Sequence, residues 1–425
     1  MKRILMLNTL PIINFDSKNK KKKTAGNQTL YNTLKGYSDN GISVTMITFC
    51  DVPKKDTPFP NIVIRRSIFY SFFNFLLKTK SRISGNFVRD KKNTAPTTDI
   101  KRTGSRVFLN FWEKVGYIEG LFYAWRINPD IIYGYEIYST NLAKKIADKL
   151  ELPVVSRFQG TELGFFIDDD AKFKSAICYI KGTQVSTDLI IMANDGTDGD
   201  KVLEKLNVDP SKTRFWVNGL HNKEKYIKFN KDINYRAKMN IPKDATIICT
   251  ANRFVDWKRI DRIINVMDEL EKINSKFYLV AIGDGPEKAA LNELVKSLNL
   301  KNIIFTGALE HKDAIYHIAN SDLYITLNHS GNLGNSILEA LALGIVVCTL
   351  KNDSVENVLK DGYNSVLFTT TDEKDIANKL ITLINDESKL EILKNNARIY
   401  AQQNLLSWTD RMKLEIGEVE KLEKK

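Results

Sequence analysis

The chain has 425 residues, of which 43% are hydrophobic and 27% are charged, so it is too long for one ordinary domain and can build full cores. Its formal net charge is +12, and the excess is concentrated where twelve Lys/Arg stand against three acids between residues 61 and 115. No stretch reaches the ~18–20 apolar residues of a membrane span, and the cysteines and histidines lack metal-ligand spacing, so we expect neither a spanning helix nor a bound metal.

In the first half, short apolar strand-like runs alternate with helix-like segments. The predicted strands cover residues 4–7, 43–49, 61–65, 130–134, 154–158, 189–193 and 214–217, and the predicted helices cover 27–40, 106–127 and 138–150. Between residues 67 and 106 the pattern degrades into basic and aromatic residues. We interpret this segment as an insertion that contacts an anionic membrane surface, with an irregular solvated loop as the alternative. No RNA-binding signature accompanies it, so nucleic acid is not an expected partner.

The second half repeats the alternation more clearly. Predicted strands cover residues 246–250, 277–282, 303–305, 323–327 and 345–349, and helices begin near residues 257, 286, 311, 334 and 353. Near-continuous apolar strands separated by helices indicate parallel sheets that are covered on both faces. We therefore predict an α/β protein with two doubly wound, Rossmann-like domains facing each other across a cleft. The predicted units are residues 1–218, residues 219–404 and a C-terminal helix in 405–425 that packs back toward the N-terminal domain.

The most informative stretch covers residues 330–344. An apolar run is followed by Gly331 and Gly334, then by a helix-forming segment that ends near Gly344. A strand, a glycine turn and a helix start direct unpaired backbone N–H groups at an anion. Asn335 and Glu339 are four residues apart and share one helix face, and a carboxylate there can take two ribose hydroxyls. The stretch therefore predicts a nucleotide-activated substrate.

Further polar residues follow the ends of other predicted strands. Arg253 and Lys258 could clamp a diphosphate, or could be a solvated helix start. Gly283 opens a Gly-Asp-Gly-Pro turn that allows close approach of a ligand. Gly26 begins a helix after a lysine-rich loop, and it is either a second phosphate-facing turn or part of a flexible loop. After the strand that ends at Phe158, two more polar side chains reach the predicted cleft, Gln159 and Glu162.

Taken in order, these motifs resemble those of the retaining glycosyltransferases of family four, which have the GT-B architecture. The resemblance implies transfer of a sugar from a nucleotide sugar to an acceptor hydroxyl, with no metal and no cofactor besides that co-substrate. By position it makes Arg253, Lys258 and Glu339 the catalytic residues. It assigns donor binding to a larger set, namely Gly26, Gly283, Gly307, Gly334, Asn335, Ser336 and Glu339, and it places Gln159 and Glu162 on the acceptor side.

Two positions depart from the pattern of the family. Gly331 stands where an acid usually contacts the donor sugar, and Gln159-Gly160 replaces the usual His-Gly of the N-terminal domain. Our hypothesis is a hexosyltransferase that uses a UDP-sugar and a glycan or lipid-linked acceptor in surface polysaccharide synthesis. It would act in the cytoplasm, at the inner membrane face. The alternatives are a catalytically inactive GT-B partner or regulatory protein, and a sugar-nucleotide epimerase.

Overall fold

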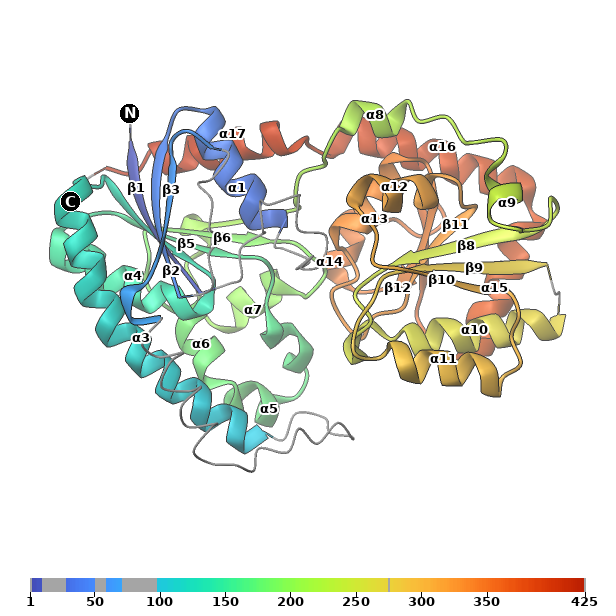
Figure 1. Cartoon of the computed structure of the whole chain (residues 1–425), viewed down its shortest axis with the longest axis horizontal. Coiled ribbons are helices and arrows are strands. Elements are labelled where there is room, and N and C mark those ends of the chain that lie inside the picture. Colours follow the sequence, from blue (N-terminus) through green and yellow to red (C-terminus); the bar gives the residue numbers. More distant parts are fainter. Residues whose placement is uncertain (1, 10–27, 50–58, 71–97, 274–275, 424–425) are drawn as a thin grey trace.

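The computed structural model describes residues 2–9, 28–49, 59–70, 98–273 and 276–423. They form two α/β domains that lie side by side, with the N-terminal domain in blue to green and the C-terminal domain mainly in yellow to red (Figure 1). Each domain contains one parallel sheet with helices on its faces, which confirms the predicted fold class. The predicted phosphate-facing turn at Gly26 lies outside the described residues, as does much of the basic segment, residues 71–97.

The N-terminal sheet has seven parallel strands in the order β3-β2-β1-β4-β5-β6-β7. Their bounds are β1 Arg3–Asn8, β2 Ser43–Thr48, β3 Ile62–Arg66, β4 Ile131–Tyr135, β5 Val154–Phe158, β6 Leu189–Ala193 and β7 Thr213–Trp216. Every residue of the central strands β4 and β5 is buried, which explains their continuous apolar runs. The helices are α1 Gln28–Asp39, α3 Thr98–Ile127, α4 Ile137–Leu150, α5 Asp170–Ser175, α6 Ile177–Thr183 and α7 Gly199–Lys205, with 3₁₀ turns η1 Glu162–Phe166 and η2 Pro210–Lys212.

The C-terminal sheet has six parallel strands in the order β10-β9-β8-β11-β12-β13. Their bounds are β8 Thr246–Ala251, β9 Phe277–Ile282, β10 Ile303–Gly307, β11 Leu323–Thr326, β12 Val346–Leu350 and β13 Ser365–Phe368. Around the sheet lie η3 Asp256–Lys258 and helices α10 Ile260–Ile273, α11 Lys288–Ser297, α12 His311–Ala319, α13 Asn335–Ala342, α14 Asp353–Glu356, α15 Glu373–Asn385 and α16 Glu387–Asn404. Two short helices lie in the connection between the domains, α8 Lys223–Ile227 and α9 Tyr235–Lys238.

Helix α3 is longer than the sequence pattern predicts. It begins at Thr98, whereas the predicted helix began at residue 106, so its first turns fall in the segment that we interpreted as a basic insertion. Among the described residues, no helix is both long and apolar enough to cross a bilayer.

Helix α17 (Trp408–Glu420) follows the C-terminal domain but packs against the N-terminal one, beside α1 (Figure 1). Ser407 caps it by accepting a hydrogen bond from the amide of Asp410 at 3.1 Å. Its buried residue Glu415 accepts hydrogen bonds from the hydroxyls of Tyr37 at 3.1 Å and Tyr133 at 2.8 Å. Glu415 also pairs with the buried Arg157 of β5.

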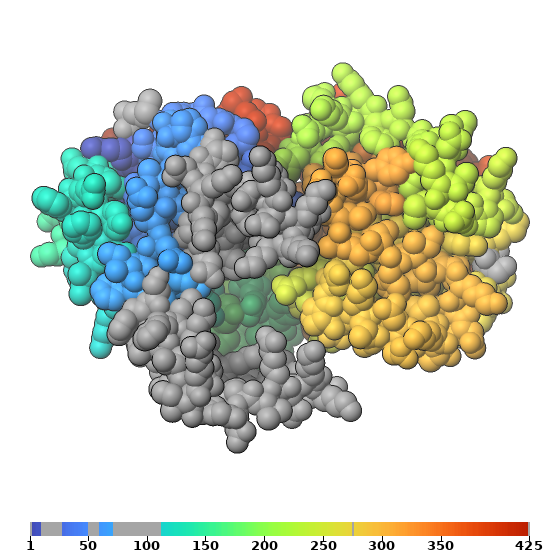
Figure 2. Space-filling model, in the orientation of Figure 1, coloured from blue at the N-terminus to red at the C-terminus, as the bar shows by residue number. Residues whose placement is uncertain are grey.

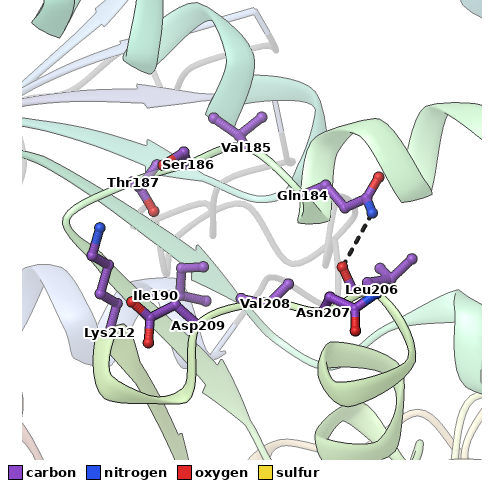
Figure 3. Close-up of a pocket in the computed structure, with 10 residues that line it drawn as sticks. All are labelled: Gln184, Val185, Ser186, Thr187, Ile190, Leu206, Asn207, Val208, Asp209 and Lys212. Carbon is purple, nitrogen blue, oxygen red and sulfur yellow. Dashed lines mark hydrogen bonds between the residues drawn. The ribbon is translucent and has the colours of Figure 1, made fainter.

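One cavity, of about 480 Å³, lies near the amino ends of β6 and β7, and Figure 3 shows the residues that line it. Its lining comes mainly from the segments that lead into β6 and β7, namely Gln184, Val185, Ser186, Thr187, Ile190, Leu206, Asn207, Val208, Asp209 and Lys212. The side-chain amide of Gln184 donates a hydrogen bond across it to the carbonyl of Leu206 at 3.2 Å. Because ligands of doubly wound sheets bind at the carboxyl ends of the strands, this cavity is not part of the candidate site.

Candidate active site

The loops that follow β8, β9 and β10 meet at the carboxyl edge of the C-terminal sheet. The amide of Asn252 donates to the carbonyl of Ile282 at 3.0 Å, and the amide of Gly283 donates to the carbonyl of Gly307 at 3.0 Å. Gly283 has a φ of 146°, and a Cβ there would lie 1.8 Å from the carbonyl oxygen of Asn252. A side chain at this position is therefore excluded, and the backbone of β9 can end close to that of β8.

Helix α13 begins in the same place and presents its first amides to the edge of the sheet. Gly334 is its N-cap, and no atom lies within 4 Å of where a Cβ of Gly334 would be. The hydroxyl of Ser336 lies 2.8 Å from that of Tyr324 and 3.4 Å from the carbonyl oxygen of Ala251. These contacts fix the helix start beside the end of β8, so its N-terminal amides and dipole are available to an anion.

Glu339 lies one turn into α13, and only 5% of its surface is exposed. Its Oε1 is 2.7 Å from Nε2 of His311, and this hydrogen bond raises the pKa of His311. The His311 ring lies 5.5 Å from the ring of His221. Burial, followed by the nearby His311, lowers the pKa of His221 to about 4. Neutral His221 can then accept a hydrogen bond from Asn32 of α1 at 3.0 Å, so Glu339 is connected to the N-terminal domain.

Lys258 and Arg253 lie in different environments. Burial lowers the pKa of Lys258 to about 8, while the negative charge of Asp195 opposes that shift. The Lys258 ammonium is 4.0 Å from the centroid of the Trp257 ring. The Arg253 side chain is exposed, and its guanidinium forms no hydrogen bond or ion pair with any described residue. A dehydrated ammonium and a free guanidinium after one strand provide the two kinds of cation that bind a diphosphate.

The N-terminal side of the cleft is acidic. Burial raises the pKa of Glu136, the residue after β4, to about 8, and its Oε1 accepts a hydrogen bond from the amide of Gln159 at 2.8 Å. The negative charges of Asp195 and Glu162 raise this pKa further. Glu162 is exposed and also raises the pKa of Tyr179. Burial raises the pKa of Asp195, after β6, to about 6.

The domains touch through backbone and aromatic contacts beside these residues. The amides of Gly331 and Leu333 donate to the carbonyls of Gly196 at 3.2 Å and Asp195 at 2.9 Å. Phe165 of η1 stacks on His329 and lies edge-on to Trp257, at centroid distances of 5.9 and 6.1 Å. In the space-filling view, a recessed green surface separates the outer parts of the two domains (Figure 2).

The structure thus brings most of the predicted site residues to two facing edges. Arg253, Lys258, the turn glycines and the start of α13 lie on the C-terminal side, and Gln159 and Glu162 lie on the N-terminal side. Asn335 bridges to the connection between the domains, because its Oδ1 accepts a hydrogen bond from Asn218 at 3.0 Å. Our sequence reasoning missed Glu136, Asp195 and His311, since no spacing rule identifies them. Within the described ranges, no three His, Cys, Asp or Glu side chains form a group that could hold a metal.

Fold and site together define a two-domain protein of the GT-B class. Anabaena HepE, solved in complex with UDP and glucose, has a similar structure, with a TM-score of 0.66 over 99% of both chains at 16% identity. Residues 231–400 match the family Glycosyl transferases group 1. The match lies in the C-terminal domain and confirms the resemblance to glycosyltransferases there.

Two curated relatives are named for transferase reactions. Sulfoquinovosyl transferase SQD2 of Arabidopsis thaliana is 24% identical over 284 residues, which cover 64% of this chain and 53% of the relative. Lipopolysaccharide core biosynthesis glycosyltransferase LpsE of Rhizobium meliloti is 27% identical over 154 residues, which cover 36% of this chain and 44% of the relative. The matched segments span about half of each relative.

Proposed function

We propose that the protein is a retaining glycosyltransferase that moves a hexose-type sugar from a UDP-sugar to a hydroxyl of a glycan or lipid-linked acceptor in surface polysaccharide synthesis. The observation that carries the proposal is the grouping of the half-buried Lys258, the start of α13 and the buried Glu339 at one sheet edge. Cations and a helix start suit a diphosphate, and a carboxylate one turn further suits a ribose.

In the proposed reaction, the bond between the anomeric carbon and the diphosphate oxygen breaks, and the acceptor oxygen bonds to that carbon on the same face. The leaving phosphate oxygen takes the proton of the acceptor hydroxyl. Lys258 and Arg253 stabilise the negative charge that grows on the diphosphate, which is where preorganised cations accelerate such a step. None of these steps uses a metal or another cofactor.

Assay of donor hydrolysis and UDP binding over a panel of UDP-sugars tests the proposal, with the unsubstituted protein compared with Glu339→Ala. Loss of one charge-assisted contact costs roughly 1.5–3 kcal/mol, or about ten- to 150-fold in kcat/KM. Glu391→Ala is the matched control, because Glu391 lies on the outer surface of α16, where it pairs with Lys394. If the unsubstituted protein shows neither turnover nor UDP binding, this result would favour an inactive GT-B partner. Epimer formation without transfer would favour an epimerase.

We further propose that the protein works in the cytoplasm, at the inner membrane face, where a lipid-linked acceptor would be presented. Arg65 and Arg66 support this, because both are exposed at the end of the edge strand β3, beside the basic segment. Charge reversal at Arg65, Arg66, Lys78 and Lys80 should reduce flotation with anionic liposomes. Unchanged flotation would remove the membrane proposal but would leave the transferase proposal intact.

A further inference from the structure

The proposed reaction leaves the Asp195 carboxylate without a role, although this residue lies where the two domains meet. Asp195 follows β6 and is partly buried between the two domains. Its Oδ1 accepts hydrogen bonds from the Thr197 hydroxyl at 2.6 Å and the Thr197 amide at 3.2 Å. Within the described part of the chain, both hydrogen bonds to this carboxylate go to Oδ1. The carboxylate is therefore oriented through one oxygen, and the other remains available to accept hydrogen bonds.

Asp195 follows β6 of the N-terminal domain, and Lys258 lies in η3 of the C-terminal domain, on the other side of the domain contact. Burial lowers the pKa of Lys258, and the negative charge of Asp195 opposes that shift. A carboxylate and an ammonium that face each other in this way suit a ligand with hydroxyls at one end and a diphosphate at the other.

Asp195 lies close to Gly331, one of the two positions at which the sequence departs from its family, and to Gly160, which follows the other departure, Gln159. A Cβ on Gly160 would lie 2.2 Å from Oδ2 of Asp195, so the glycine makes room for the carboxylate. A Cβ on Gly331 would lie 3.9 Å from the carbonyl oxygen of Asp195. That carbonyl also accepts a hydrogen bond from the amide of Leu333 at 2.9 Å, which fixes the two loops against each other.

We propose that Asp195 binds the hydroxyls of the sugar carried by the donor, so that the N-terminal domain supplies the acid that is absent at Gly331. This inference rests on the proposed function and names the residue that selects the sugar. A site built to pair with hydroxyls rejects a sugar that presents them differently, because buried polar groups are then left unpaired. The negative charge also stabilises positive charge that develops at the anomeric carbon.

The test compares Asp195→Asn with the unsubstituted protein by donor hydrolysis and by UDP binding. Asn has the shape of Asp, so the loops can keep their contacts, and Asp195→Ser, which is smaller, provides a second variant. We expect kcat/KM for the best UDP-sugar to fall by roughly 10- to 100-fold. The affinity for UDP itself, which carries no sugar, should change by less than about threefold or increase, since a negative charge has been removed.

The matched control is Asp200→Asn. Asp200 lies on α7 of the same domain and accepts a hydrogen bond from Ser354 across the domain contact at 2.9 Å, but it does not influence the protonation of Lys258. The Asp200→Asn substitution should leave both donor hydrolysis and UDP binding unchanged. Unchanged hydrolysis by Asp195→Asn, or an equal loss of UDP affinity, would overturn the role of Asp195 alone. Absence of hydrolysis and UDP binding in the unsubstituted protein would instead overturn the transferase proposal, and this inference with it.

Discussion

The low pKa of Lys258 gives a direct test of the diphosphate site through the pH dependence of turnover. Burial lowers this pKa from its usual value of 10.5 to about 8. The protonated form carries the charge, so the clamp is charged below this pKa and loses its charge as the pH rises through it. In the free enzyme, about nine tenths of Lys258 is charged at pH 7 and about one tenth at pH 9. We therefore expect kcat/KM to fall on the alkaline side of about pH 8, approaching tenfold per pH unit.

Substitution of Lys258 by Arg isolates this effect. An arginine stays charged throughout the accessible pH range, so the alkaline fall should disappear in Lys258→Arg even if its maximal rate is lower. The assay is hydrolysis of the best UDP-sugar at subsaturating concentration, from about pH 6 to about pH 9. At saturating donor, the fall in kcat should move to higher pH in the unsubstituted protein, because the bound diphosphate stabilises the ammonium.

Two outcomes would refute this reasoning. An alkaline fall that persists unchanged in Lys258→Arg would assign it to a group other than Lys258. A flat profile in the unsubstituted protein would mean that the charge of Lys258 is not required. The control is Lys296→Arg, because the exposed Lys296 pairs only with a neighbouring acid on α11, so this exchange should leave the profile unchanged.

The remaining predictions concern the helix of the C-terminus and the ribose site. Glu415→Gln leaves two buried arginines without a counter-charge and should lower the free energy of unfolding in urea by about 3–5 kcal/mol. The control is Glu418→Gln, at a partly exposed ion pair of the same helix, which should lower it by less than about 1 kcal/mol. Equal losses in the two variants would contradict this prediction. Glu339→Ala should lower the pKa of His311, measured by NMR titration of the ring protons, because it removes the hydrogen bond that raises it; an unchanged titration would show that the two side chains do not interact in solution.

The fold was predictable because parallel strands that are covered on both faces leave an unbroken apolar run. All residues of β4, β5 and β6 are buried, and each was recognisable as such a run. The N-cap at Ser407 was predictable for a different reason, since a capping side chain and its helix are neighbours in the chain. The edge strand β13 was missed because it has only four residues and follows a glycine turn.

Contacts between distant residues were beyond prediction. Arg157 and Glu415 are 258 positions apart, and alone each is an ordinary charged residue in an element that otherwise looks apolar or amphipathic. Burial of the pair is tolerated because two tyrosine hydroxyls complete the hydrogen bonding of the carboxylate. No local sequence pattern reveals that Arg157 and Glu415 pair, although this pair helps to hold α17 against the N-terminal domain.

The candidate site likewise has one part that follows from local sequence and one part that depends on contacts between distant residues. Its phosphate-binding part consists of backbone amides, whose geometry depends on turn glycines close in sequence to the helix that they start, so Gly334 and α13 could be recognised from one stretch. Its sugar-facing part depends on side chains that meet only when two domains close. Asp195 follows an unremarkable strand, and it reaches Gly331 because the loops after β6 and β11 share backbone hydrogen bonds. The proposed nucleotide site is therefore readable from local sequence, whereas the proposed sugar contact at Asp195 depends on how the two domains fit together.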